Sequence, residues 1–125
     1  MRIALIGWGY LIWDRRGLDI SPDWLADGPL LPVEFARFAV PPRLLPVLVE
    51  DAPLQPTFWT LSQKHSVLAA AADLAVREGV GTHDIGSWSR SAAMRPPIGF
   101  EAMIAQWAES RDLDGAVWRA VEPNL

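Results

Sequence analysis

The segment that most constrains the fold is residues 3–13, an apolar stretch near the start of the chain that carries no charge. Residues 2–7 form a short apolar run closed by glycine, which predicts a buried strand, and the Gly-Trp-Gly sequence at 7–9 predicts a loop directly after it. A helix that crosses a bilayer needs about 20 apolar residues, so this stretch is too short to do so. It runs into the charged residues 14–16 without the cleavage site of a signal peptide. We therefore interpret it as folded protein and expect no membrane partner.

Composition limits the classes of protein to which these 125 residues can belong. Half of the residues are hydrophobic and no segment has the composition of a linker, so we expect a single domain over residues 1–125. The lack of cysteine excludes disulfides, thiolate nucleophiles and zinc–thiolate sites, and it favours the reducing cytoplasm. The 11 Lys and Arg residues are outnumbered by 15 Asp and Glu residues and are scattered singly. We therefore expect no nucleic-acid partner.

Further β-type runs lie in the middle and at the end of the chain. Residues 33–40 and 43–50 are rich in Val, Leu and Phe and predict a pair of strands. Pro46 cannot donate a ladder hydrogen bond, so the second of these strands should be an edge or carry a bulge there. Residues 57–61 predict another strand, and residues 115–121 predict the last one.

Two longer segments have helical periodicity. Residues 65–78 predict a helix that Gly79 ends, with a buried face formed by Val67, Leu68, Ala71, Leu74 and Ala75. Residues 97–111 predict a second helix, which buries Phe100, Met103, Ile104 and Trp107. Ser21 before Pro22 predicts one additional helical turn, with Ser21 as its N-cap. Strands and helices in this order indicate an α/β protein of the α+β type.

The common nucleotide, metal and hydrolase motifs are missing. The glycine pair at 7–9 lacks the third glycine of the dinucleotide fingerprint, and no Gly-Lys-Ser/Thr sequence is present. His65 and His83 lie far apart in the sequence, with no cysteine to complete a set of ligands. No serine lies in a Gly-x-Ser-x-Gly elbow. We therefore expect no metal site and no cofactor, and interpret both histidines as surface or capping residues.

Two glutamates remain as candidates for carboxylate chemistry. Alternation in the apolar run 33–40 places Glu34 on the same face as Ala36, Phe38 and Val40. Glu34 is then either a functional residue that points inward, or an ordinary exposed strand residue or ion-pair partner. Glu78 ends the predicted helix 65–78, where the partial negative charge of the helix end disfavours a carboxylate. It is either functional or an ordinary helix end.

The order of several motifs resembles the γ-glutamylcyclotransferase-like superfamily. Residues 7–13 resemble the Gly-Tyr-Gly-Ser-Leu-Ile-Trp segment that follows the first strand in that superfamily. Residues 74–79 are similar to its Leu-Asp-x-x-Glu-Gly motif, in which the glutamate is the catalytic acid/base. Two further segments look like features of the short bacterial branch of that superfamily. They are residues 27–37 and the end of the sequence, from Ala-Val-Trp at 116–118 to Pro-Asn at 123–124.

The resemblance implies a small mixed β-barrel with flanking helices and the release of 5-oxoproline from a γ-glutamyl amine or peptide. Glu78 would be the general acid/base, moving a proton from the substrate ammonium to the leaving nitrogen. Main-chain N–H groups after the first strand would hold the substrate α-carboxylate, and glycines would let the main chain approach this small-molecule ligand closely. The substrate-binding residues would be Gly7, Trp8, Gly9, Tyr10 and Leu11, with Glu34 as a second acidic candidate.

Three positions depart from the pattern of that superfamily. Trp8 replaces a tyrosine, Tyr10 replaces a small serine, and Ala75 replaces the aspartate of the second motif. These changes fit either an altered substrate or a member without turnover. The alternative interpretation is a non-catalytic ligand-binding or interaction module on the same fold.

Overall fold

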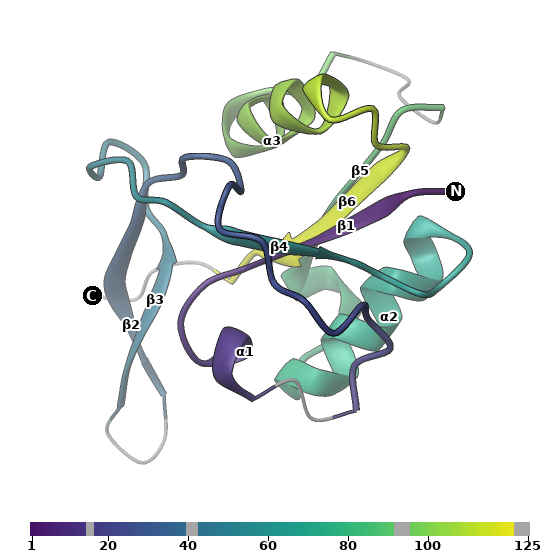
Figure 1. Cartoon of the computed structure of the whole chain (residues 1–125). Coiled ribbons are helices and arrows are strands. Elements are labelled where there is room, and N and C mark those ends of the chain that lie inside the picture. The colour runs from purple at the N-terminus through teal and green to yellow at the C-terminus, as the bar shows by residue number, and fades with distance from the viewer. Residues whose placement is uncertain (15–16, 40–42, 92–95, 122–125) are drawn as a thin grey trace.

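A computed structural model describes residues 1–14, 17–39, 43–91 and 96–121. Its centre is a four-stranded sheet in the order β4-β1-β6-β5 (Figure 1). The strands are β1 (Ile3–Gly7), β4 (Phe58–Leu61), β5 (Ile85–Ser89) and β6 (Gly115–Arg119). β1 is antiparallel to β4 and parallel to β6, and β5 is antiparallel to β6. The strands predicted at residues 2–7, 57–61 and 115–121 are confirmed.

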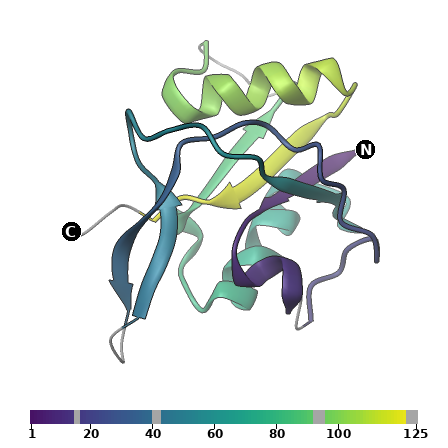
Figure 2. The ribbon, with the colours of Figure 1, turned by 60° about the vertical axis from the view of Figure 1, so that its left-hand side comes forward.

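Two helices cover opposite faces of this sheet, α2 (Val67–Glu78) on one and α3 (Gly99–Ser110) on the other (Figures 1 and 2). Alternation in β1 separates the two cores, since successive side chains of a strand point to opposite faces. Ile3 and Leu5 pack in one cluster with α2, whereas Ala4 and Ile6 pack in the other with α3. The four-residue helix α1 (Tyr10–Trp13) lies on the α2 side and contributes Leu11 to that core.

The strands β2 (Val33–Ala39) and β3 (Arg43–Leu48) form a separate two-stranded sheet, which confirms the predicted pair. In a two-stranded sheet both strands are edges, as proline in a strand requires. The register also shifts between Phe35 and Arg37, directly beside the pairing of Phe35 with Pro46. The strand ladders of the described residues form two open sheets, so the fold is of the mixed α+β kind and the predicted barrel is not confirmed.

Both long helices are confirmed, with corrections to their ends and faces. Ser66 caps α2 by accepting a hydrogen bond from the Ala69 N–H, and Gly79 ends the helix with a φ of 68°. The prediction that Leu68 is buried is wrong, because it is 84% exposed while Ala70 is fully buried. α3 begins at Gly99 rather than at Pro97.

One sequence prediction outside the long helices is wrong because main-chain pairing between distant segments replaces local structure. The helical turn predicted after Ser21 is absent, and the chain there runs alongside β4. The Leu25 N–H donates to the Trp59 carbonyl, and the Trp59 N–H donates back. The strand β5 and the short 3-10 helix η1 (Thr82–Asp84) were not predicted. Within the described ranges, no helix has the length and apolar character needed to cross a membrane.

Candidate functional site

Glu78 lies at the carboxyl end of α2, where two arginines surround its carboxylate. Its Oε2 atom is 3.5 Å from a guanidinium nitrogen of Arg77 and 3.5 Å from one of Arg119. The Glu78 side chain is 13% exposed, and those of Arg77 and Arg119 are 8% and 23% exposed. The two cations offset the unfavourable position of a carboxylate at a helix C-terminus. The carboxylate therefore stays partly accessible while both arginines fix its orientation.

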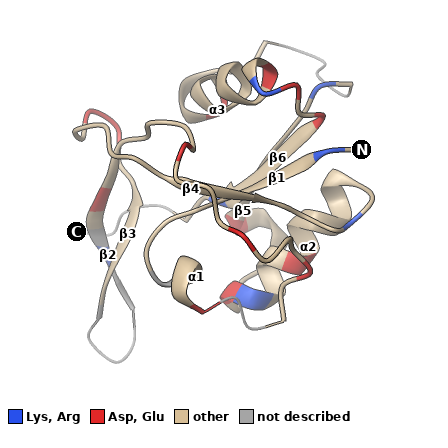
Figure 3. Cartoon of the chain, in the orientation of Figure 1, with Lys and Arg blue, Asp and Glu red and all other residues tan. Residues whose placement is uncertain are grey.

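The same two arginines connect Glu78 to the loop that follows β1. Arg119 ends β6 and Gly7 ends the parallel strand β1, each two residues after the paired residues Val117 and Leu5, so both strands end at the same edge of the sheet. On the other side, the Arg77 Nε donates to the main-chain oxygen of Asp14, just after α1, at 2.8 Å. Glu78 and the segment from Gly7 to Asp14 therefore meet at one edge of the sheet. Figure 3 shows basic and acidic residues together at this end of α2.

The loop itself is held against β3. The Trp8 indole N–H donates to the Pro46 carbonyl at 2.9 Å, and Gly9 has a φ of 68° that favours glycine. A Cβ at Gly9 would lie 3.0 Å from Pro46 Cγ, and one at Gly7 would lie 2.9 Å from the Leu11 side chain. The glycines at these two positions therefore allow the loop to pack closely on its own chain.

The remaining predicted site residues lie in different surroundings. Leu11 is buried in the core with α2, and Trp8 packs partly buried against the core with α3. Glu34 is an exposed residue of β2, and the register shift between Phe35 and Arg37 interrupts the alternation that grouped it with later residues. Val40 and the side chains of Tyr10, Ala36 and Phe38 lie outside what the structure describes. The geometry thus brings together Glu78 and the loop, and leaves Glu34 on the separate sheet.

A second polar cluster, centred on Asp27, was not predicted. Its carboxylate accepts hydrogen bonds from the Trp59 indole at 2.8 Å and from Arg111 at 3.0 Å. These hydrogen bonds, that from Trp59 above all, lower the pKa of Asp27 below its ordinary value of 3.8. The Trp107 indole donates to the main-chain oxygen of Asp27 and contacts the Trp59 ring edge to face. The cluster fastens the loop before β2 to α3.

In the described parts of the chain, no group of three or more His, Asp or Glu side chains is arranged to hold a metal ion. His65 and His83 are both exposed, and His83 lies 3.5 Å from the Asp84 carboxylate. Sequence reasoning missed the contribution of Arg77 and Arg119 to the site. The pairing of β6 with β1, which carries Arg119 to the loop, left no signal in either segment alone.

Comparison with known proteins yields no match to a protein-family model, a curated protein or a solved structure.

Proposed function

We propose that this chain is a γ-glutamylcyclotransferase-like protein that binds a γ-glutamyl compound where Glu78 meets the loop after β1. The observation that carries the proposal is the convergence of the carboxylate with that loop through Arg77 and Arg119. In the superfamily that the sequence resembles, the corresponding loop and glutamate form one site. The mixed barrel of that superfamily and a cytoplasmic location belong to the same proposal.

The proposed reaction is an intramolecular cyclisation that requires positioning and one proton carrier. The α-amine of the γ-glutamyl group attacks its own γ-carbonyl carbon, forming a new C–N bond as the bond to the leaving nitrogen breaks. Glu78 takes a proton from the substrate ammonium and returns it to the leaving nitrogen. The second proton, which the attacking nitrogen loses as the ring amide forms, passes to the released amine, so that 5-oxoproline and a protonated amine result. Gly9 directly precedes α1 and Tyr10 is its first residue, and the first main-chain N–H groups of a helix lack a partner within the helix. We assign the substrate α-carboxylate to them.

The experiment is a panel of γ-glutamyl amines and dipeptides incubated with the purified chain, with 5-oxoproline detected by mass spectrometry. We expect product from at least one compound and a loss of about 100-fold or more in Glu78→Gln, in line with the usual contribution of a general acid/base. Glu109→Gln, which neutralises an exposed acid on α3, is the matched control and should keep full activity. Absence of product from every compound would refute the catalytic proposal.

The tight packing of the loop favours a second candidate, a ligand-binding module without turnover. Gly7 and Gly9 face side chains of their own chain, and Trp8 is hydrogen-bonded to β3. A binding module predicts that γ-glutamyl compounds raise the melting temperature without being converted. Trp8→Phe, which removes the hydrogen bond to Pro46, should then weaken binding more than Glu78→Gln does.

A further inference from the structure

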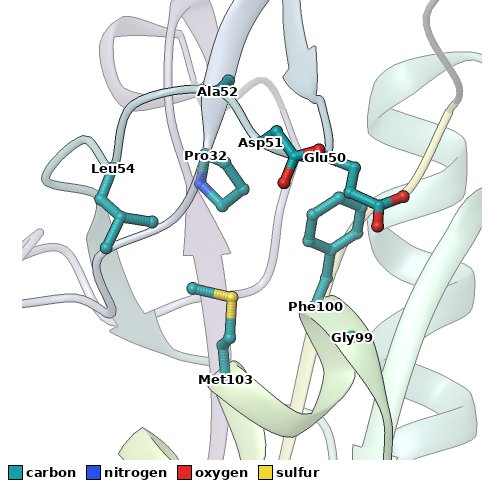
Figure 4. A pocket seen from close by; sticks show the side chains of 8 residues that line it. All are labelled: Pro32, Glu50, Asp51, Ala52, Leu54, Gly99, Phe100 and Met103. Carbon is teal, nitrogen blue, oxygen red and sulfur yellow. The ribbon is translucent and has the colours of Figure 1, made fainter.

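A pocket of about 400 Å³ lies away from Glu78, between the loop after β3 and the start of α3 (Figure 4). It is lined by Pro32, Glu50, Asp51, Ala52, Leu54, Gly99, Phe100 and Met103. Its volume falls within the range of about 300–1,000 Å³ that is usual for small-molecule sites. Because α3 and α2 cover opposite faces of the sheet, the pocket and Glu78 belong to different sides of the protein.

The pocket combines an apolar wall with negative charge. Pro32 is buried, and Phe100 and Met103 pack partly buried against the core, so these side chains are fixed in place. The charge comes from Glu50 and Asp51, which are both exposed and form no hydrogen bond or ion pair with any described residue. Figure 4 shows the two carboxylates toward the Phe100 side of the pocket, with Leu54 toward the other side.

No positive side chain balances these carboxylates among the described residues that line the pocket. The nearby N-terminus of α3 contributes a partial positive charge of about half a unit, because Ile98 offers no capping side chain. Two full negative charges outweigh it. The apolar wall and the net negative rim together select for a ligand with an apolar body and a positive head. The face of Phe100 favours the same cation, since aromatic rings attract positive charge.

We propose that this pocket binds a small organic cation, an ammonium group attached to an aromatic or branched aliphatic body. The ammonium group lies between Phe100 and the carboxylates of Glu50 and Asp51, and the apolar body lies against Pro32, Leu54 and Met103. This site is independent of the proposed function of Glu78, because it shares no residue with it.

The test is a titration of the isotope-labelled full chain with 2-phenylethylammonium, followed through its backbone amide NMR signals. The matched neutral probe is 2-phenylethanol, which keeps the ring and replaces the charged group. We expect the ammonium probe to shift signals from residues 50–54 and 99–103. The alcohol should bind about fivefold more weakly or worse, since the attraction between one cation and two exposed carboxylates corresponds to about a fivefold change in affinity.

A double variant, Glu50→Gln with Asp51→Asn, separates charge from shape. Asp51 has a φ of 68°, a conformation that asparagine also tolerates, so the variant keeps the loop geometry. We expect it to bind the ammonium probe about fivefold more weakly. The control, Asp23→Asn with Glu109→Gln, makes the same change in net charge at exposed positions elsewhere and should bind normally. Equal binding of the two probes, unchanged binding in the pocket variant, or no shifts in these two segments would each overturn the proposal.

Discussion

Two glycines with the same backbone conformation provide a direct test of how the loop after β1 is held. Gly9 and Gly79 both have a φ of 68°. A Cβ at Gly79 would meet nothing within 4 Å, whereas one at Gly9 would lie 3.0 Å from Pro46 Cγ. For Gly79→Ala we expect a loss of about 1 kcal/mol in the free energy of unfolding. The left-handed conformation costs an L-residue about 1–2 kcal/mol, and the smaller entropy of the unfolded chain offsets part of this.

Gly9→Ala should lose about 2–4 kcal/mol, because an added methyl in a tight contact typically costs a further ~1–3 kcal/mol. Urea unfolding followed by tryptophan fluorescence measures both values, provided that the slopes with denaturant agree. Gly17→Ala is the control, because Gly17 has open space around it and is not among the glycines with positive φ. The free energy of unfolding of this variant should stay within about 0.5 kcal/mol of the wild-type value. Equal losses for Gly9→Ala and Gly79→Ala would refute the reasoning, since Pro46 would then move aside at no cost.

Three further predictions test the core, the cluster around Asp27 and the candidate site. Leu74→Ala should lose about 2–5 kcal/mol in urea unfolding because Leu74 is fully buried, whereas Leu68→Ala should change stability by less than about 0.5 kcal/mol; similar losses would contradict the assigned helix face. Because the pKa of Asp27 is lower in the folded protein than in the unfolded chain, the ionised carboxylate stabilises the fold above pH 3.8, and this stabilisation is lost as the pH falls through the pKa of the folded state. The difference in stability between the wild type and Asp27→Asn should therefore shrink in acid, and a difference independent of pH would contradict this. A double-mutant cycle with Glu78→Gln and Arg119→Met should give a coupling energy of about 1 kcal/mol, because both side chains are mostly buried; additive effects would show that the ion pair contributes nothing.

The elements that the sequence predicted are those with a strong local pattern. The helix at 67–78 has an apolar period, a capping serine and a terminal glycine, and each acts within a few residues. The predicted buried face of this helix is rotated slightly from the observed one, because Leu68 matches the helical spacing as well as Ala70 does. Only the position of the sheet decides which of the two is buried. The strand at 85–89 has polar and glycine residues between Ile85 and Trp88, so periodicity alone could not reveal it.

The segment before β2 shows why local signals can mislead. Ser21 and Pro22 have the residue types of a helix start, but main-chain hydrogen bonds to β4 hold the chain extended from Ile20 to Leu25. Such pairing joins residues more than 30 positions apart, and no capping preference within the segment can outweigh it. Asp27 was overlooked for the same reason, because its partners Trp59 and Arg111 come from distant elements.

The convergence of Glu78 with the loop after β1 follows from the sheet topology. Because β1 and β6 are parallel, the loop that begins at Gly7 and the last residue of β6, Arg119, leave the sheet at the same edge. β5 is antiparallel to β6, and its first residue, Ile85, pairs with Arg119, so β5 begins at this edge too. Only six residues separate Glu78 from Ile85, which keeps the end of α2 close to the same place. The strand order itself therefore brings the end of α2 and the loop that begins at Gly7 to the same edge of the sheet, whatever side chains the loop carries at Trp8 and Tyr10.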